Sequence, residues 1–206
     1  MERARTAASR RGAWRRWAVA LALSAGLAFP TLAQETSAAL ETQVEAAFLV
    51  NFLRYTDWPP ERAAPVDEPL VITVVGDPAM AAALARLVEV VPPVRGRGIE
   101  VQRLEFPEGA DATVRASLSD RLRRSHLVFV HDSREPVAAI LGDLSGQPVL
   151  TVSDRPGFVA EGGMLGLRRL GGRIVFEANP GAIRNARLVV SAKVLKLARI
   201  VEGTVR

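Results

Sequence analysis

Short apolar runs alternate with helix-like segments along the middle of the chain, and this alternation constrains the fold more than any other feature. The runs are "PLVITVVG" (69–76), "IEVQRL" (99–104), "HLVFVH" (126–131) and "PVLTVS" (148–153). The first is continuously apolar and rich in β-branched residues, which is typical of a strand buried on both faces. Strands separated by helices and short loops indicate βαβ units on a mostly parallel sheet that is covered by helices.

Helices are predicted between these strands from their capping residues and periodicity. Asp77 is a good N-cap, and Pro78 suits the first turn of a helix over 79–89. Two further helices are predicted over about 111–124 and 133–141.

An earlier helix is predicted over "TQVEAAFLVNFLRY" (42–55), where Thr42 and Glu45 fit a capping box. Aromatic side chains gather in and just after this helix: Phe48, Phe52, Tyr55 and Trp58. The first three share one helical face, and the two prolines after Trp58 end the helix. Core packing explains most of this surface, and we expect the remainder to serve as a docking surface for a partner.

The C-terminal third departs from the strand–helix rhythm. After a glycine-bearing loop over 153–163, two strands are predicted over 164–170 and 173–179. Gly171-Gly172 between them indicates a hairpin, because both central residues of a type I′ turn need positive φ. Two helical segments are then predicted around Ser191, the second with an apolar side formed by Val194, Leu195, Ala198 and Val201. The whole pattern predicts one three-layer α/β domain, with a mostly parallel sheet flanked by helices and a C-terminal β-hairpin and helix.

Residues 1–33 have the form of a cleavable export signal. A basic leader precedes the apolar run "WAVALALSAGLAF", and small residues follow, which places cleavage near Ala33. The apolar run is too short to span a bilayer, which takes about 20 residues. We therefore expect a periplasmic domain over 34–206 that does not insert into the membrane after cleavage.

Removing this leader changes the charge balance. The whole chain has 27 basic and 22 acidic residues, and the leader holds 6 arginines and 1 glutamate, which leaves 21 of each. A net charge of zero without a basic patch disfavours nucleic-acid binding. The chain also has no cysteine, which excludes disulfides and thiol ligands.

No set of residues in the sequence indicates catalysis or metal binding. His126 and His131 are the only histidines, and five positions along a strand would point them to opposite faces. Glu177 and Asn179 share one face of a predicted strand, where they could bind a ligand or instead hold the neighbouring loop and cap the next helix. We predict no catalytic residue, metal or cofactor, and no enzymatic activity.

Several segments resemble the YfiR-like periplasmic proteins. "AAFLVNFLRYTDWP" (46–59) is similar to their opening helix, and "VVGDP" (74–78) resembles their first strand and turn. Residues 157–201 resemble the C-terminal signature of the family: a Gly-Phe loop, a glycine pair, a hairpin ending Phe-Glu-x-Asn, and a Ser-x-Lys-x-Leu-x-Leu-Ala helix. The matching residues are Gly157, Phe158, Gly162, Gly163, Phe176, Glu177, Asn179, Ser191, Lys193, Leu195, Leu197 and Ala198.

The resemblance implies a periplasmic repressor. Such a protein binds the sensory region of an inner-membrane diguanylate cyclase, or of another sensor, and restrains it, which lowers cyclic di-GMP and biofilm formation. It also allows a homodimer. Better-studied members carry disulfides, so redox regulation is not carried over to this cysteine-free chain.

We expect partner contacts from eight residues: Phe48, Phe52, Tyr55, Trp58, Phe158, Glu177, Asn179 and Lys193. The alternative function is a small-molecule binding module that reports a ligand to a membrane sensor. That function predicts a pocket where the carboxyl ends of the strands meet the 155–163 loop.

Overall fold

The computed structural model describes residues 30–62, 68–131, 137–171 and 173–203, with side chains from Ala38 onward. Most of the predicted export signal, including its basic leader and apolar run, lies outside the described residues, as does the start of the helix predicted at 133. The residues from Thr42 onward form one compact unit.

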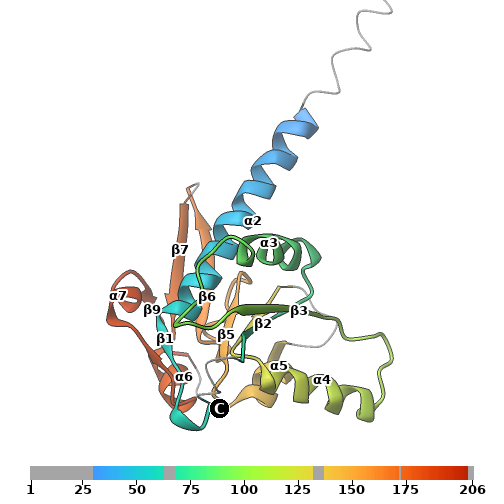
Figure 1. The fold of residues 1–206 in the computed structure, drawn as a ribbon, viewed down its shortest axis with the longest axis vertical. Helices are drawn as coiled ribbons and strands as arrows, with labels where there is room; N and C mark the ends of the chain where they lie inside the picture. The colour runs from blue at the N-terminus through green and yellow to red at the C-terminus, as the bar shows by residue number, and fades with distance from the viewer. Residues whose placement is uncertain (1–29, 63–67, 132–136, 172, 204–206) are drawn as a thin grey trace, which may run out of the picture. The chain divides into compact units, whose positions relative to one another are not determined.

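The elements follow the predicted order through the middle of the chain (Figure 1). The strands of the main sheet are β2 (Leu70–Val75), β3 (Ile99–Leu104), β4 (Leu127–Val130), β5 (Leu150–Ser153), β6 (Leu165–Leu170), β7 (Arg173–Ala178) and β9 (Arg199–Ile200). The helices that connect them are α3 (Pro78–Val88), α4 (Ala112–Arg124), α5 (Val137–Leu144), α6 (Pro180–Asn185) and α7 (Ala192–Leu195). Helix α2 (Pro30–Arg54) precedes the sheet.

Seven strands form the main sheet in the order β3-β2-β4-β5-β6-β7-β9. Every neighbouring pair from β3 to β6 is parallel, β6 and β7 are antiparallel, and β7 pairs with β9 in parallel. The predicted α/β fold with a mostly parallel sheet is therefore confirmed. Gly171 has a φ of 56°, as the predicted hairpin turn requires.

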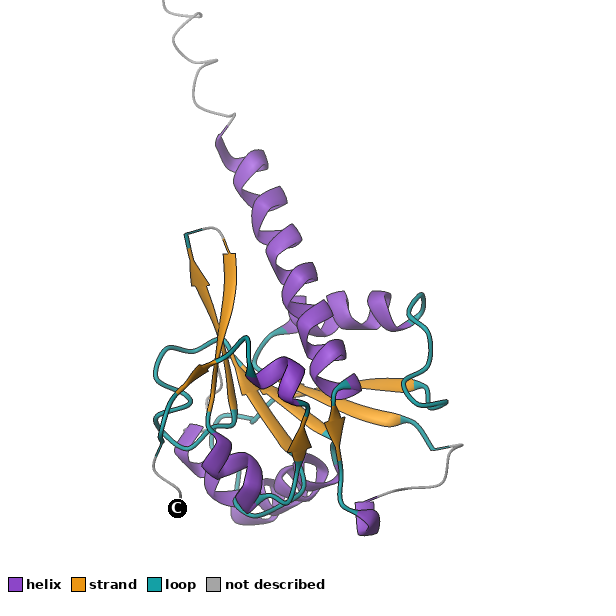
Figure 2. Ribbon diagram, turned by 90° about the vertical axis from the view of Figure 1, so that its left-hand side faces the viewer, coloured by secondary structure: helices purple, strands orange, loops and turns teal. Residues whose placement is uncertain are grey.

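Helices cover both faces of the sheet (Figure 2). On one face, Leu49 and Leu53 of α2 and Leu84 of α3 belong to one buried apolar cluster. On the other face, Leu122 of α4 and Ile140 of α5 belong to a second cluster. Strands β2 and β4 contribute to both clusters, and this two-sided burial is why their sequences are almost entirely apolar.

The first helix begins earlier than predicted. Helix α2 is continuous from Pro30 to Arg54, so Thr42 and Glu45 do not form a capping box at its start. The Glu45 side chain is buried, and its Oε1 accepts a hydrogen bond from Arg169 Nε at 2.8 Å. The carboxylate joins α2 to the hairpin.

The C-terminal segment also differs from the prediction. The second helical segment is the single turn α7, and the residues after it form the short strand β9. Val201 N donates to Ala178 O at 2.9 Å beside this pairing. Before α7, strand β8 (Val189–Val190) pairs with β1 (Thr56–Asp57) in a separate two-stranded sheet. The apolar spacing suited a longer helix, but the chain instead pairs β8 with β1 and β9 with β7.

Candidate partner-binding surface

The aromatic residues of α2 are mainly core. Phe52 is buried, and its ring lies 5.3 Å from Phe176 and 6.1 Å from Phe48, centroid to centroid. Phe48 is half-buried and lies 6.3 Å from Phe176. These rings join α2 to β7, and Phe52 presents no side-chain surface to a partner, contrary to its predicted role.

Tyr55 and Trp58 lie after this cluster and have different surroundings. Tyr55 is 41% exposed, and its carbonyl accepts a hydrogen bond from Ser191 N at 2.8 Å. Trp58 is half-buried, with its ring edge-on to His126 at 5.5 Å. Of the predicted aromatic contacts, Tyr55 is the most exposed.

Two other predicted contact residues are interior. Phe158 is 1% exposed, and its ring lies so close to Gly163 that a Cβ there would stand 2.2 Å from it. Asn179 is also 1% exposed and is the N-cap of α6, since its Oδ1 accepts from Ala182 N at 3.0 Å. Phe158 packs within the loop, and Asn179 caps α6. Because both side chains are buried, they do not offer the contact surface that was predicted for them.

Glu177 is paired with arginines rather than with Lys193. Its carboxylate lies 3.6 Å from Arg168 Nη1 and 3.7 Å from Arg199 Nη1, and its side chain is 12% exposed. Lys193 is exposed at the start of α7, where its backbone N–H donates to Ser191 Oγ. Glu177, a residue of β7, therefore lies between Arg168 of β6 and Arg199 of β9.

The structure adds exposed aliphatic residues that the sequence analysis missed. Val189 is 62% exposed, Leu197 76% and Ile200 51%. We call these three residues, together with Tyr55 and Lys193, the C-terminal edge; they lie in or next to β1, β8, α7 and β9. The sequence analysis placed Leu197 and Ile200 in the second helical segment, outside its apolar side of Val194, Leu195, Ala198 and Val201, and did not identify them as contact residues.

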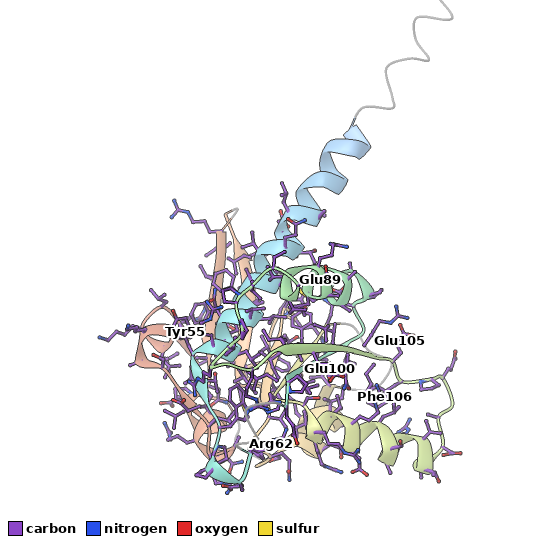
Figure 3. All side chains as sticks on the ribbon, viewed as in Figure 1. Tyr55, Arg62, Glu89, Glu100, Glu105 and Phe106 are labelled. Carbon is purple, nitrogen blue, oxygen red and sulfur yellow. The ribbon has the colours of Figure 1, made fainter. Side chains whose placement is uncertain are left out.

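A polar pocket lies elsewhere, at the amino ends of β2 and β4. It has a volume of about 480 Å³, and Arg62, Arg124, Glu100 and His126 contribute to its lining. Figure 3 labels Arg62 and Glu100 there, apart from Tyr55. A ligand pocket was expected at the 155–163 loop, and a cavity that Glu161 and Gly162 help to line has a volume of about 50 Å³.

The polar pocket has a lining of mixed charge, in which Glu61, Glu68 and Glu100 lie beside Arg62 and Arg124. Val71 N donates to His126 Nδ1 at 3.0 Å, which leaves the proton of the neutral ring on Nε2. Burial, with the positive charges of Arg62 and Arg97, lowers the pKa of His126 to about 4. Burial and Arg97 also lower the pKa of Arg62. Among the described residues, Trp58 Nε1 and Arg62 Nε are buried donors without an acceptor.

The chain belongs to the YfiR/HmsC-like family, whose sequence profile matches residues 42–199. The family is periplasmic and non-catalytic, and it is known in the regulation of diguanylate cyclases through interaction with a membrane sensor. No curated protein sequence matches the chain. In the part of the chain that the structure describes, no helix is long and apolar enough to cross a membrane.

One solved structure similar to this chain is a conserved domain protein from Vibrio cholerae O1 biovar eltor strain N16961. The sequences are 13% identical, and the TM-score is 0.44. The alignment covers 63% of this chain and 54% of that protein, so the chain spans about half of its length.

Proposed function

We propose that this protein is a periplasmic repressor that binds the periplasmic region of an inner-membrane diguanylate cyclase and lowers cyclic di-GMP. Residues 1–33 would direct export, and the domain that follows would act after cleavage near Ala33. Membership of the YfiR/HmsC-like family supports this class of function.

The composition of the C-terminal edge supports its choice as the contact site for the cyclase. Leu197 and Ile200 are more than half exposed, and Lys193, Lys196 and Arg199 surround them. Exposed aliphatic side chains that gather on one surface with a polar rim are typical of protein-binding sites. A partner with apolar and acidic residues fits this surface.

The mechanism is preferential binding to the inactive state of the cyclase. A repressor shifts its target only as far as its affinity for the inactive state exceeds that for the active state. A ratio of about 100 corresponds to about 2.7 kcal/mol, which a few buried contacts supply.

Deleting the gene is expected to raise the cyclic di-GMP level, and expression of the full chain is expected to return it to the wild-type level. A version without residues 2–33 should not lower cyclic di-GMP, because that protein would stay outside the periplasm. Leu197→Glu should lose repression, since a charge at a contact residue costs about 2 kcal/mol or more. Val90→Glu is the matched control, because Val90 is 79% exposed but follows α3 rather than lying on the C-terminal edge.

Unchanged cyclic di-GMP on deletion would contradict the cyclase assignment. Repression by Leu197→Glu equal to that by Val90→Glu, at equal periplasmic protein levels, would remove the C-terminal edge from the mechanism while leaving the function in place.

Ligand sensing is the second candidate, and the buried donors without acceptors beside the polar pocket favour it. Trp58 Nε1 and Arg62 Nε each need an acceptor oxygen, so succinate and inorganic phosphate are suitable probes. Ligand at 100 times Kd adds about 2.7 kcal/mol of stability. Melting curves of the wild-type chain should then shift upward by about 5–10 °C. Arg62→Met should abolish the shift, and no shift with either probe would count against this function.

A further inference from the structure

The outer edge of β7 is open along most of its length. Asn179 N donates to Met164 O at 2.9 Å, and these two residues stand opposite each other in the register of the hairpin. Hydrogen-bonded pairs recur at every second position of an antiparallel ladder, so Glu177, Val175 and Arg173 bond to β6. Ile174, Phe176 and Ala178 consequently turn their backbone N–H and C=O groups away from β6.

Strand β9 covers only the last part of this edge. It pairs with Glu177 and Ala178, and Val201 N donates to Ala178 O. Among the described residues, no other strand pairs with β7 on that side. The Glu177–Arg199 pairing also occupies the outward C=O of Phe176. The N–H and C=O of Ile174 and the N–H of Phe176 are therefore left for another chain, and Figures 1 and 2 show the hairpin extending past β9. Unpaired strand edges of this kind accept added strands.

The side chains around this edge are basic. Arg173 is exposed and has no ion-pair partner among the described residues. Arg168 and Arg199 share the single carboxylate of Glu177, and Arg169 pairs with Glu45. Val175, 40% exposed, adds an apolar position between Arg173 and Glu177 on the same face. Excess cations beside an apolar strand fit an incoming strand that alternates acidic and apolar residues.

We propose that an extended acidic segment of the membrane sensor adds to the sheet as a strand along the outer edge of β7, beside Ile174–Phe176. This inference rests on the proposed function and specifies the partner as a strand rather than a helix. A second copy of this chain is the poorer occupant, because pairing two hairpins would bring like charges together.

A proline at Ile174 tests the strand directly. Ile174→Pro removes an N–H that faces away from β6, so the hairpin ladder stays intact, while an added strand loses a hydrogen bond and meets the proline ring. Ile174→Ala is the matched control, since it removes a side chain and keeps the N–H. The probe is a fluorescent eight-residue peptide of alternating Glu and Val, with its Lys and Val counterpart as the charge control.

We expect the full chain to bind the acidic peptide and not the basic one. Ile174→Pro should weaken binding about tenfold or more, and Ile174→Ala less than about threefold. Equal binding by both variants, with melting temperatures matched, would overturn strand addition. If Ile174→Pro fails to fold, Arg173→Glu decides: it should weaken acidic-peptide binding, whereas Arg86→Glu on α3 should not. If both arginine variants bind the acidic peptide as tightly as the wild-type chain, the assignment of the peptide to the edge of β7 is overturned.

Two outcomes separate this inference from the proposed function. Repression of the cyclase by Ile174→Pro at the wild-type level would reject the strand and keep the function. Peptide binding without any effect of the gene on cyclic di-GMP would reject the function and keep the strand. Because the chain has no cysteine, Val175→Cys provides a single thiol. A disulfide-linked homodimer of that variant in the periplasm would overturn the choice of occupant.

Discussion

Replacing Phe52 with alanine is expected to lower the free energy of unfolding by about 3–5 kcal/mol. The ring is buried and packs against Phe176 and Phe48, so its removal leaves a cavity between α2 and β7. Tyr55→Ala, one helical turn further, should change stability by less than about 1 kcal/mol because that side chain is 41% exposed. Urea unfolding of the two variants measures the difference.

The pair of variants also separates packing from docking within one short segment. Tyr55→Ala should weaken repression of the cyclase at normal protein levels, whereas Phe52→Ala should weaken it through loss of folded protein. Equal stability of the two variants would contradict the assignment of Phe52 to the core.

Acidification from pH 6.5 to about pH 4 is expected to remove about 3 kcal/mol of stability through His126 alone. The ring is buried and neutral, and its pKa falls from an ordinary 6.5 to about 4. Between pH 4 and 6.5, His126 is protonated in the unfolded chain and neutral in the folded chain. The free energy of unfolding therefore rises with pH, and this loss of stability is absent well above pH 6.5. Urea unfolding at several pH values measures the slope.

His126→Asn isolates this contribution, because the amide oxygen can accept the Val71 N–H in place of Nδ1. In this variant the free energy of unfolding should change much less between pH 4 and 6.5. The slope that remains is the contribution of the carboxylates. His131→Gln gives the comparison for the other histidine, which is at the far end of β4 with its Nδ1 2.7 Å from the Asp154 carboxylate. A slope in His126→Asn equal to that of wild type would show that this ring does not titrate as described.

The parallel part of the sheet could be predicted because its determinants are local. Nearly continuous apolar residues define β2 and β4. Asp77 caps α3 as expected, with its Oδ1 accepting from Met80 N at 2.9 Å. The hairpin was equally readable, since Gly171 supplies the positive φ that its turn needs.

The short strands could not be predicted from the sequence. Strands β1, β8 and β9 each have two residues, too few for a periodic pattern, and each forms only because a distant strand edge needs a partner. The same limit affects the candidate surface. Family motifs singled out Phe158 and Asn179, but a motif does not show that a side chain is buried or that an amide caps a helix.

The contacts between α2 and the hairpin have a consequence for synthesis. Glu45 and Arg169, which form a hydrogen bond, are 124 positions apart. The helix is therefore made long before the strands that cover its aromatic face, and native contacts this far apart form slowly. A growing chain must keep Phe48 and Phe52 uncovered until the hairpin emerges. We therefore expect fragments that end before β6 to expose these rings and to be removed by proteases.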